Sequence, residues 1–473
     1  MRETFRRYSS FISDYRPMPL NQSLLFLLES GRKIDVVSEL QDMPTVEVAE
    51  FVAGLEDKDR REVFLMLESQ QQAYVFSDFD DEMQRWFIEG MSGRELSALM
   101  VNMPSDERAD LYQNMKVEEQ GNLLPYLPKQ VRDDVIQLSS YPEDTAGAAM
   151  SSDFATVTVK MTVRQAMEQV RRDAPKKETI YYIYVVDEDR KLLGFVSLKD
   201  IILAEPDETI GIILHEDVVS VNVREDQEKA SNLVIKYDLI ALPVVNDENQ
   251  LIGIITHDDA IDIVSQEQTE DIHKIGGSEA FDEPYMDIPF FQMFRKRAGW
   301  LVILFLSEML TATAMGFFEA EIARAVVLAL FVPLIISSGG NSGSQAATLI
   351  IRAMALGEVT LSQWWRVMKR EVLTGLTLGV LLGLIGFMRV VLWSSFTNLY
   401  GPHYVLIGMT VGLSLVGVVA WGTLMGSMLP LILRRLGFDP AASSAPFVAT
   451  LVDVTGLVIY FSISLAILSG TLL

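Results

Sequence analysis

The chain has 473 residues, long enough for about three domains. Its formal net charge of −25 excludes a nucleic-acid-binding protein, and the lack of cysteine excludes disulfide scaffolds, thiolate metal sites and cysteine nucleophiles. Only seven of the 64 acidic side chains lie after residue 289, against eleven of the 39 basic ones. The sequence therefore predicts an acidic, water-soluble front part followed by a membrane part, with no nucleic-acid partner.

Residues 1–140 have the pattern of short amphipathic helices. The first twenty residues contain no apolar run of the signal-peptide type, so we expect everything before the first apolar span to stay in the cytosol. Residues 43–51 and 103–111 each open with Met-Pro-Thr/Ser and resemble each other, which predicts an all-α superhelix of paired helices. Asp106 and Asp110 share one face of the second segment, and spacing alone favours a solvated acidic face.

A clearer repeat follows. Residues 184–200 recur as residues 243–259, an offset of 59, and each copy reads as strand, turn, strand and a helix opened by Ser/Thr-x-x-Asp. The preceding helices are expected at residues 163–172 and 227–236. The predicted boundaries are 141–210 for a first α/β domain, 211–258 for a second, and 259–289 for a helix and linker that lead to the membrane part.

Carboxylates gather around the second copy of the repeat and the helix that follows it. Such hard oxygen ligands suit Mg²⁺ or Ca²⁺ rather than zinc or copper. A solvated charge run is the usual explanation for this composition, but a membrane part follows, and this favours a cation site. The cluster consists of Asp226, Glu228, Asp238, Asp258, Asp259, Asp262, Glu267, Glu270 and Asp271.

Five apolar segments after residue 289 are each long enough to cross the ~30 Å of hydrocarbon in a bilayer. If the spans alternate, nine of the eleven basic side chains lie on one side, and Arg324 and Arg389 lie on the other. This asymmetry predicts a cytosolic amino end and a carboxyl terminus on the outer side. The spans are expected at 298–318, 323–350, 372–392, 405–433 and 444–472.

Asp453 is the acidic side chain of the fifth span. A carboxylate there costs roughly 3 kcal/mol or more unless it faces a bundle interior, a water path or a cation. It is either a structural Asp bonded to a neighbouring helix or part of an ion path. Pro333 with the glycines after it, and Pro446, are expected to interrupt the second and fifth spans, while Asn341 and Gln345 add amide oxygens. Close packing through small residues is the other explanation for the glycines.

The stretches PLIISSGGNSGSQAA (333–347) and DPAASSAPFVATLVDVTG (439–456) resemble the bacterial MgtE-type magnesium channel/transporter family, as does YPEDTAGAAM (141–150). The α/β repeat resembles a tandem pair of cystathionine-β-synthase (CBS) domains. The resemblance extends over essentially the whole chain, in the family's domain order. It implies a multi-domain protein with an all-α superhelical amino-terminal domain, tandem α/β CBS domains and a five-helix all-α transmembrane domain (290–473).

The resemblance also implies a homodimer in a bacterial inner membrane that imports Mg²⁺ through one pore between two membrane domains. Asp453 is then the Mg²⁺-selecting carboxylate, and the Ala449 backbone, Asn341 and Thr450 line the same path. Ala445 stands where some relatives carry Asn, which speaks against an additional site at the cytoplasmic mouth.

In such a protein, cytosolic Mg²⁺ binds between the soluble domains and the connecting helix, and the compact state that it favours closes the pore. The implied sensor residues are Asp106 and Asp110 on the amino-terminal domain, Asp226, Glu228 and Asp238 on the CBS side, and Asp259, Asp262, Glu270 and Asp271 on the connecting helix. For some relatives the resemblance implies ATP at the CBS pair. Thr256 and Asp259 are the candidates here, whereas Ser197 and Asp200 are read as a helix cap.

Two other functions stay open. A secondary transporter coupled to protons or sodium would use Asp453 as the carrier. An adenine-nucleotide-sensing regulatory protein would use the spans merely as an anchor. An enzyme is not expected, because the sequence contains no nucleophile–base arrangement, zinc motif or phosphate loop.

Overall fold

The computed structural model describes residues 19–281, 285–286, 288–397 and 399–472, and leaves out the side chains of residues 19–22 and 81. The residues that bear on the signal-peptide prediction, 1–18, lie outside this description. The chain divides into two units, Met1–Glu267 and Gln268–Leu473.

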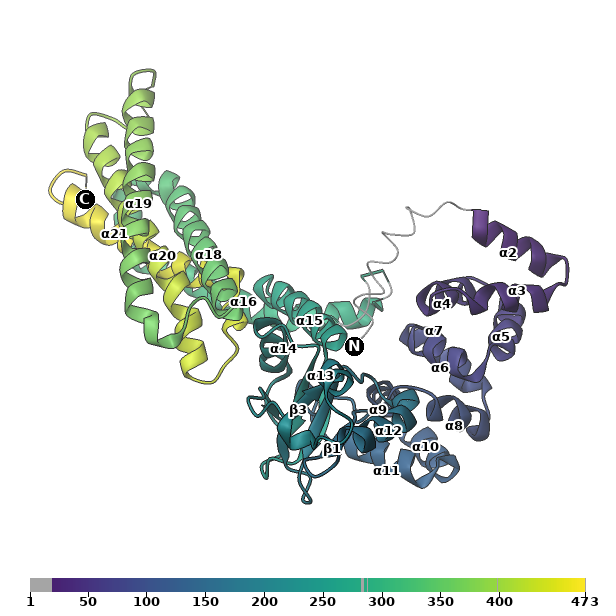
Figure 1. Cartoon of the computed structure of the whole chain (residues 1–473). Helices are drawn as coiled ribbons and strands as arrows, with labels where there is room; N and C mark the ends of the chain where they lie inside the picture. Colours follow the sequence, from purple (N-terminus) through teal and green to yellow (C-terminus); the bar gives the residue numbers. More distant parts are fainter. Residues whose placement is uncertain (1–18, 282–284, 287, 398, 473) are drawn as a thin grey trace. The chain divides into compact units, whose positions relative to one another are not determined.

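Short α-helices form the amino-terminal part of the first unit (Figure 1, purple to blue). Pro44 and Pro104 lie at the N-caps of two of these helices, α4 and α9, which confirms that the two Met-Pro-Thr/Ser segments open helices. Phe64, Phe76 and Phe87 are fully buried in the shared apolar core. The helices are α2 (Pro19–Glu29), α3 (Lys33–Gln41), α4 (Thr45–Ala53), α5 (Asp57–Met66), α6 (Ser69–Ser77), α7 (Asp81–Gly90), α8 (Gly93–Val101), α9 (Ser105–Asn114), α10 (Val117–Leu123), η2 (Leu124–Tyr126) and α11 (Lys129–Leu138).

Two three-stranded sheets follow, with the orders β1-β2-β3 and β4-β5-β6. In each, the first strand is parallel and the third antiparallel to the central strand. The bulges at Val185/Val186 and Val244/Val245 are 59 residues apart, which confirms the repeat. The strands are β1 (Thr156–Thr158), β2 (Tyr182–Val186), β3 (Leu192–Ser197), β4 (Val221–Asn222), β5 (Ala241–Val245) and β6 (Leu251–Thr256).

Helices flank the strands, and those predicted at residues 163–172 and 227–236 begin at Val163 and Gln227. Their apolar faces cover the sheets, and Ala109 of α9 and Leu138 of α11 belong to the same core as Leu242 of the second sheet. The amino-terminal helical part is therefore packed against the second α/β repeat within the first unit. These helices are α12 (Val163–Asp173), η3 (Ala174–Lys176), α13 (Leu198–Leu203), η4 (Ile210–Ile212), α14 (Gln227–Lys236) and α15 (His257–Ile275).

Among its described residues, the second unit contains five helical segments that are long and apolar enough to cross a membrane. Together with the helical amino-terminal part and the two sheets, they confirm the predicted fold class. The elements of the second unit after α15 are α16 (Phe290–Phe317), α17 (Glu319–Arg324), η5 (Val326–Phe331), α18 (Val332–Ala355), η6 (Leu361–Gln363), α19 (Trp364–Ser394), α20 (Tyr404–Arg435), η7 (Pro440–Ala442) and α21 (Ala445–Leu468).

The predicted interruption at the glycine cluster of the second span is wrong, because α18 runs through it as one helix. Pro333 and Pro446 lie in the first turns of α18 and α21, where a missing N–H removes no helical hydrogen bond. The glycines instead let α18 approach α20: a Cβ added at Gly343 would lie 3.0 Å from the carbonyl oxygen of Gly422. Close packing through small residues therefore accounts for the glycine face.

Candidate functional site

Asp453 lies eight residues after Ala445, ~12 Å along α21 from its first residue, and is half-buried. Gly340 of α18 faces it, since a Cβ added there would lie 3.6 Å from Asp453 Oδ1 and 3.4 Å from Ala449 Cβ. Two predicted path positions, Ala449 and Asp453, thus share the face of α21 that meets the glycines of α18. Within the described part of the chain, the Asp453 carboxylate has no hydrogen-bond partner. A structural role for Asp453 would require a hydrogen bond to a neighbouring helix, so this finding favours the ion path.

The amide side chains predicted for the path are exposed on the membrane unit. Asn341 directly follows Gly340 and donates from Nδ2 to Ser337 Oγ at 3.5 Å, and Gln345 lies one turn later. Thr450 donates its hydroxyl proton to the carbonyl oxygen of Pro446 at 3.0 Å, which leaves its oxygen free to accept. These groups supply the neutral oxygens that a hydrated divalent ion can contact through water.

In the first unit, the fold brings Asp106 of α9 close to Asp259 of α15. Asp259 is only 7% exposed, and burial raises its pKa well above the ordinary value; the charge of Asp106 acts in the same direction, as do Asp258 and Glu178. Such a gathering of carboxylates lowers the local potential and favours a cation. Glu178 was not predicted from the sequence, because its proximity depends on the tertiary fold and no local pattern marks it.

Two other predicted sensor residues, Asp226 and Asp238, lie at opposite ends of α14. Asp226 caps α14 by accepting a hydrogen bond from the Glu228 backbone N–H at 2.8 Å, and Asp238 follows the same helix with φ of +50°. Asp110 is half-buried on α9, and Asp262 is 5% exposed on α15. Across the described ranges, no three His, Cys, Asp or Glu side chains lie in an arrangement that could hold a metal ion. Of the predicted sensor residues, Asp106 and Asp259 lie near each other in the first unit, and Glu270 and Asp271 lie near each other in the second.

The carboxyl end of α15 carries an ion-pair network inside the second unit. Lys274 binds Glu270 and, at 2.6 Å, Asp439 Oδ2 of the segment between α20 and α21. Burial would lower the pKa of Lys274, but its hydrogen bonds with Asp439 and Glu270 raise it. Burial, aided by the charge of Asp439, raises the pKa of Asp271 to about 6. Two predicted sensor residues, Glu270 and Asp271, therefore lie beside the positive charge of Lys274.

Both Ser/Thr-x-x-Asp elements act as helix caps. Thr256 donates its hydroxyl proton to Asp259 Oδ2 at 2.5 Å, and both residues are buried. Ser197 donates to Asp200 Oδ2 at 2.5 Å, which confirms the cap predicted for the first copy. Asp200 has a second partner, His215 Nε2, at 3.1 Å. Burial alone would raise the pKa of Asp200, but the hydrogen bonds from Ser197 and His215 lower it.

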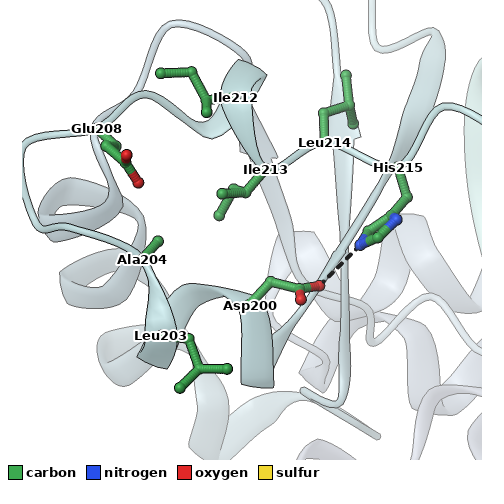
Figure 2. Close-up of a pocket in the computed structure, with 8 residues that line it drawn as sticks. All are labelled: Asp200, Leu203, Ala204, Glu208, Ile212, Ile213, Leu214 and His215. Carbon is green, nitrogen blue, oxygen red and sulfur yellow. Dashed lines mark hydrogen bonds and ion pairs between the residues drawn. The ribbon is translucent and has the colours of Figure 1, made fainter.

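A cavity of about 370 Å³ opens at the cap formed by Ser197 and Asp200. Figure 2 shows the Asp200 carboxylate and the His215 ring directed toward each other along one wall, with the aliphatic side chains and Glu208 around them. The lining consists of Asp200, Leu203, Ala204, Glu208, Ile212, Ile213, Leu214 and His215. Thr256 and Asp259 remain the predicted nucleotide residues, whereas the cavity lies at the first copy.

Comparison with known proteins places each part of the chain. The family model described as "Divalent cation transporter" matches residues 332–463, "MgtE intracellular N domain" matches 43–144, and "CBS domain" matches 146–207 and 210–266. The chain is similar to the "Magnesium transporter MgtE" of Thermus thermophilus, with 39% identity over 95% of this chain and 98% of that protein. It is 34% identical to the protein of the same name from Enterococcus faecalis, over 70% and 71% of the two chains.

The chain is also similar to a solved structure. It is titled "Crystal structure of the soluble part of a magnesium transporter" and is 30% identical, with a TM-score of 0.50, over 52% of this chain and 97% of that one. The family models match in the order of helical, α/β and membrane parts described above. The chain belongs to the MgtE family of divalent cation transporters.

Proposed function

We propose that this chain is one subunit of a homodimeric Mg²⁺ channel that imports Mg²⁺ across a bacterial inner membrane, with its amino end in the cytosol. The single observation that carries the proposal is the Asp453 carboxylate, which lies well inside an apolar helix, faces Gly340 and has no protein hydrogen-bond partner among the described residues. Mg²⁺ keeps much of its water shell in proteins, and a carboxylate with neutral oxygens nearby suits a hydrated ion. Asn341 and the Ala449 backbone are assigned to the same path.

Most of the proposed sensor residues belong to the acidic first unit. Asp259 and Asp106 oppose each other's ionised form, so the compact arrangement is costly until a divalent cation lies between them. We assign the sensor to Asp106, Asp110, Asp226, Glu228, Asp238, Asp259, Asp262, Glu270 and Asp271, and the gate to the connecting helix α15. Bound Mg²⁺ favours the closed channel by stabilising the compact state.

The proposed domains keep the sequence-based boundaries: a cytosolic helical domain at 1–140, CBS domains at 141–210 and 211–258, a connecting segment at 259–289 and the pore domain at 290–473.

An adenine nucleotide at the CBS pair is part of the proposal, and the lining of the cavity at Asp200 suits the nucleoside better than the phosphates. A carboxylate can accept both ribose hydroxyls, and the aliphatic walls suit a base. Glu208 would oppose a triphosphate, and no Lys or Arg belongs to the described lining. ATP binding to Asp200→Ala and Asp259→Ala proteins, measured by calorimetry, would decide between the first copy and Thr256 with Asp259.

The experiment that tests the function measures Mg²⁺ entry into liposomes that contain the purified full-length protein. We expect entry driven by an inside-negative membrane potential, without any proton or sodium gradient, and expect millimolar Mg²⁺ on the cytosolic face to close it. Entry that requires a proton or sodium gradient would replace the channel with a coupled transporter. No entry under any gradient would favour a nucleotide sensor that is only anchored in the membrane.

A further inference from the structure

Helices α16 and α21 are joined at two points of the membrane unit. Trp300, ten residues after the start of α16, and Phe447, in the first turn of α21, have rings 6.3 Å apart, and Trp300 Nε1 donates to Ser444 Oγ at 3.2 Å. Farther along, the ring of Phe318, the residue that follows α16, stacks on the ring of Phe461 of α21 at 4.9 Å with an interplanar angle of 19°. These contacts fix which residues of the two helices lie at the same level.

Glu308 and Asp453 lie at the same level between the two contacts. Glu308 comes eight residues after Trp300, ~12 Å along the helix, and Asp453 comes six residues after Phe447, ~9 Å along. Counting back from the stacked pair gives ~15 Å for Glu308 and ~12 Å for Asp453. Both counts place the two carboxylates within about 3 Å in height. Consistent with this placement, the charge of Glu308 acts on the Asp453 carboxylate.

Glu308 is exposed on a helix whose other exposed side chains at this level are apolar. Among the described residues it has no hydrogen bond or ion pair, and the nearest basic residue on α16, Arg297, comes eleven positions earlier, ~16 Å away along the helix. One turn after Glu308, the buried hydroxyl oxygen of Thr311 has no described hydrogen-bond partner. An ionised carboxylate that faces lipid at this depth is costly, which favours a position of Glu308 toward a bundle interior, water or a cation.

We propose that Glu308 is a second carboxylate of the ion path and helps determine its preference for divalent cations. The proposal rests on the proposed function of Asp453 as the selecting carboxylate. Two carboxylates per subunit at one level make the local potential more negative than one, and this attracts a hydrated divalent cation more than a monovalent one. Glu308 is thus a specificity-determining residue that contacts the ion through its water shell.

Because the chain contains no cysteine, a single introduced cysteine reports on water access at one position. We would label full-length Glu308→Cys protein in liposomes with a membrane-impermeant cationic methanethiosulfonate, with and without Mg²⁺. Leu306→Cys is the matched control, since Leu306 is 59% exposed on the opposite side of the same turn. We expect modification at position 308 at least tenfold faster than at 306, and slower modification when Mg²⁺ is present.

The second measurement is Mg²⁺ entry through Glu308→Gln protein. We expect the half-saturating Mg²⁺ concentration to rise about fivefold, or ~1 kcal/mol at 1.4 kcal/mol per tenfold change, with the maximal rate less affected. Equal and slow labelling at 308 and 306 would overturn the proposal, as would fast labelling that Mg²⁺ does not slow. Wild-type protein that transports no Mg²⁺ but shows Mg²⁺-protected labelling at 308 would refute the proposed function and keep Glu308 on a cation-binding water path.

Discussion

Asp271 is the residue whose protonation has the clearest consequence outside the membrane. Its pKa is raised to about 6 in the folded protein from an ordinary value of 3.8, first by burial and then by Asp439. A raised carboxyl pKa means that the folded state binds the proton more tightly than the unfolded state. The contribution of Asp271 to the stability of the folded protein is therefore complete below about pH 4 and is lost as the pH rises through about 6.

We predict that Asp271→Asn protein loses part of this pH dependence. In Mg²⁺-free buffer, the melting temperature of wild-type protein should fall more steeply between pH 4 and pH 7 than that of the variant, because the amide cannot ionise. The Asp35→Asn protein is the control, since the side chain of Asp35 on α3 is 47% exposed and pairs only with Arg32 among the described ion pairs. Parallel curves for wild type and Asp271→Asn would show that Asp271 does not titrate in this range.

At the scale of elements, the glycine crossing of α18 and α20 makes a prediction about stability. A Cβ at Gly422 would overlap the carbonyl oxygen of Gly339. Gly422→Ala should therefore force the helices apart and lower the free energy of unfolding by about 2 kcal/mol. Gly316→Ala on α16 is the control, because nothing lies within 4 Å of its added Cβ and alanine favours a helix by up to about 1 kcal/mol. Equal melting temperatures for the two variants in detergent would contradict the crossing.

Helices and strands differ in how much of them could be predicted from the sequence. The strands of the repeat follow from local alternation and from turn residues, and both copies gave the same signal 59 residues apart. The break predicted at Gly339–Gly343 was wrong because glycine in a membrane helix serves packing as well as bending, and only the partner helix tells them apart. Glu178 could not be predicted beside Asp259, since the fold alone brings them together.

At the scale of the whole molecule, the proposed mechanism makes the acidic front part responsible for the response to divalent ions. We predict that removing Mg²⁺ with a chelator increases cleavage of residues 19–267 by a protease several-fold, because carboxylates such as Asp106 and Asp259 then repel one another without a bridging ion. Added monovalent salt should weaken this effect by screening exposed charges. In Asp259→Asn protein, which can keep the cap with Thr256, the chelator should change cleavage less. Unchanged cleavage of wild-type protein on chelation would argue against a sensor in this unit.

The measurement that tests the central claim most directly is the initial rate of Mg²⁺ entry into liposomes for wild-type, Asp453→Glu and Asp453→Ala proteins, at matched protein content and membrane potential. The account predicts that Asp453→Ala lowers the rate about 100-fold, equivalent to the ~3 kcal/mol of a lost hydrogen bond to a charged group, while Asp453→Glu retains a measurable fraction. Asp453→Ala protein that folds normally and transports Mg²⁺ at the wild-type rate would contradict it, because the selecting carboxylate would then lie elsewhere.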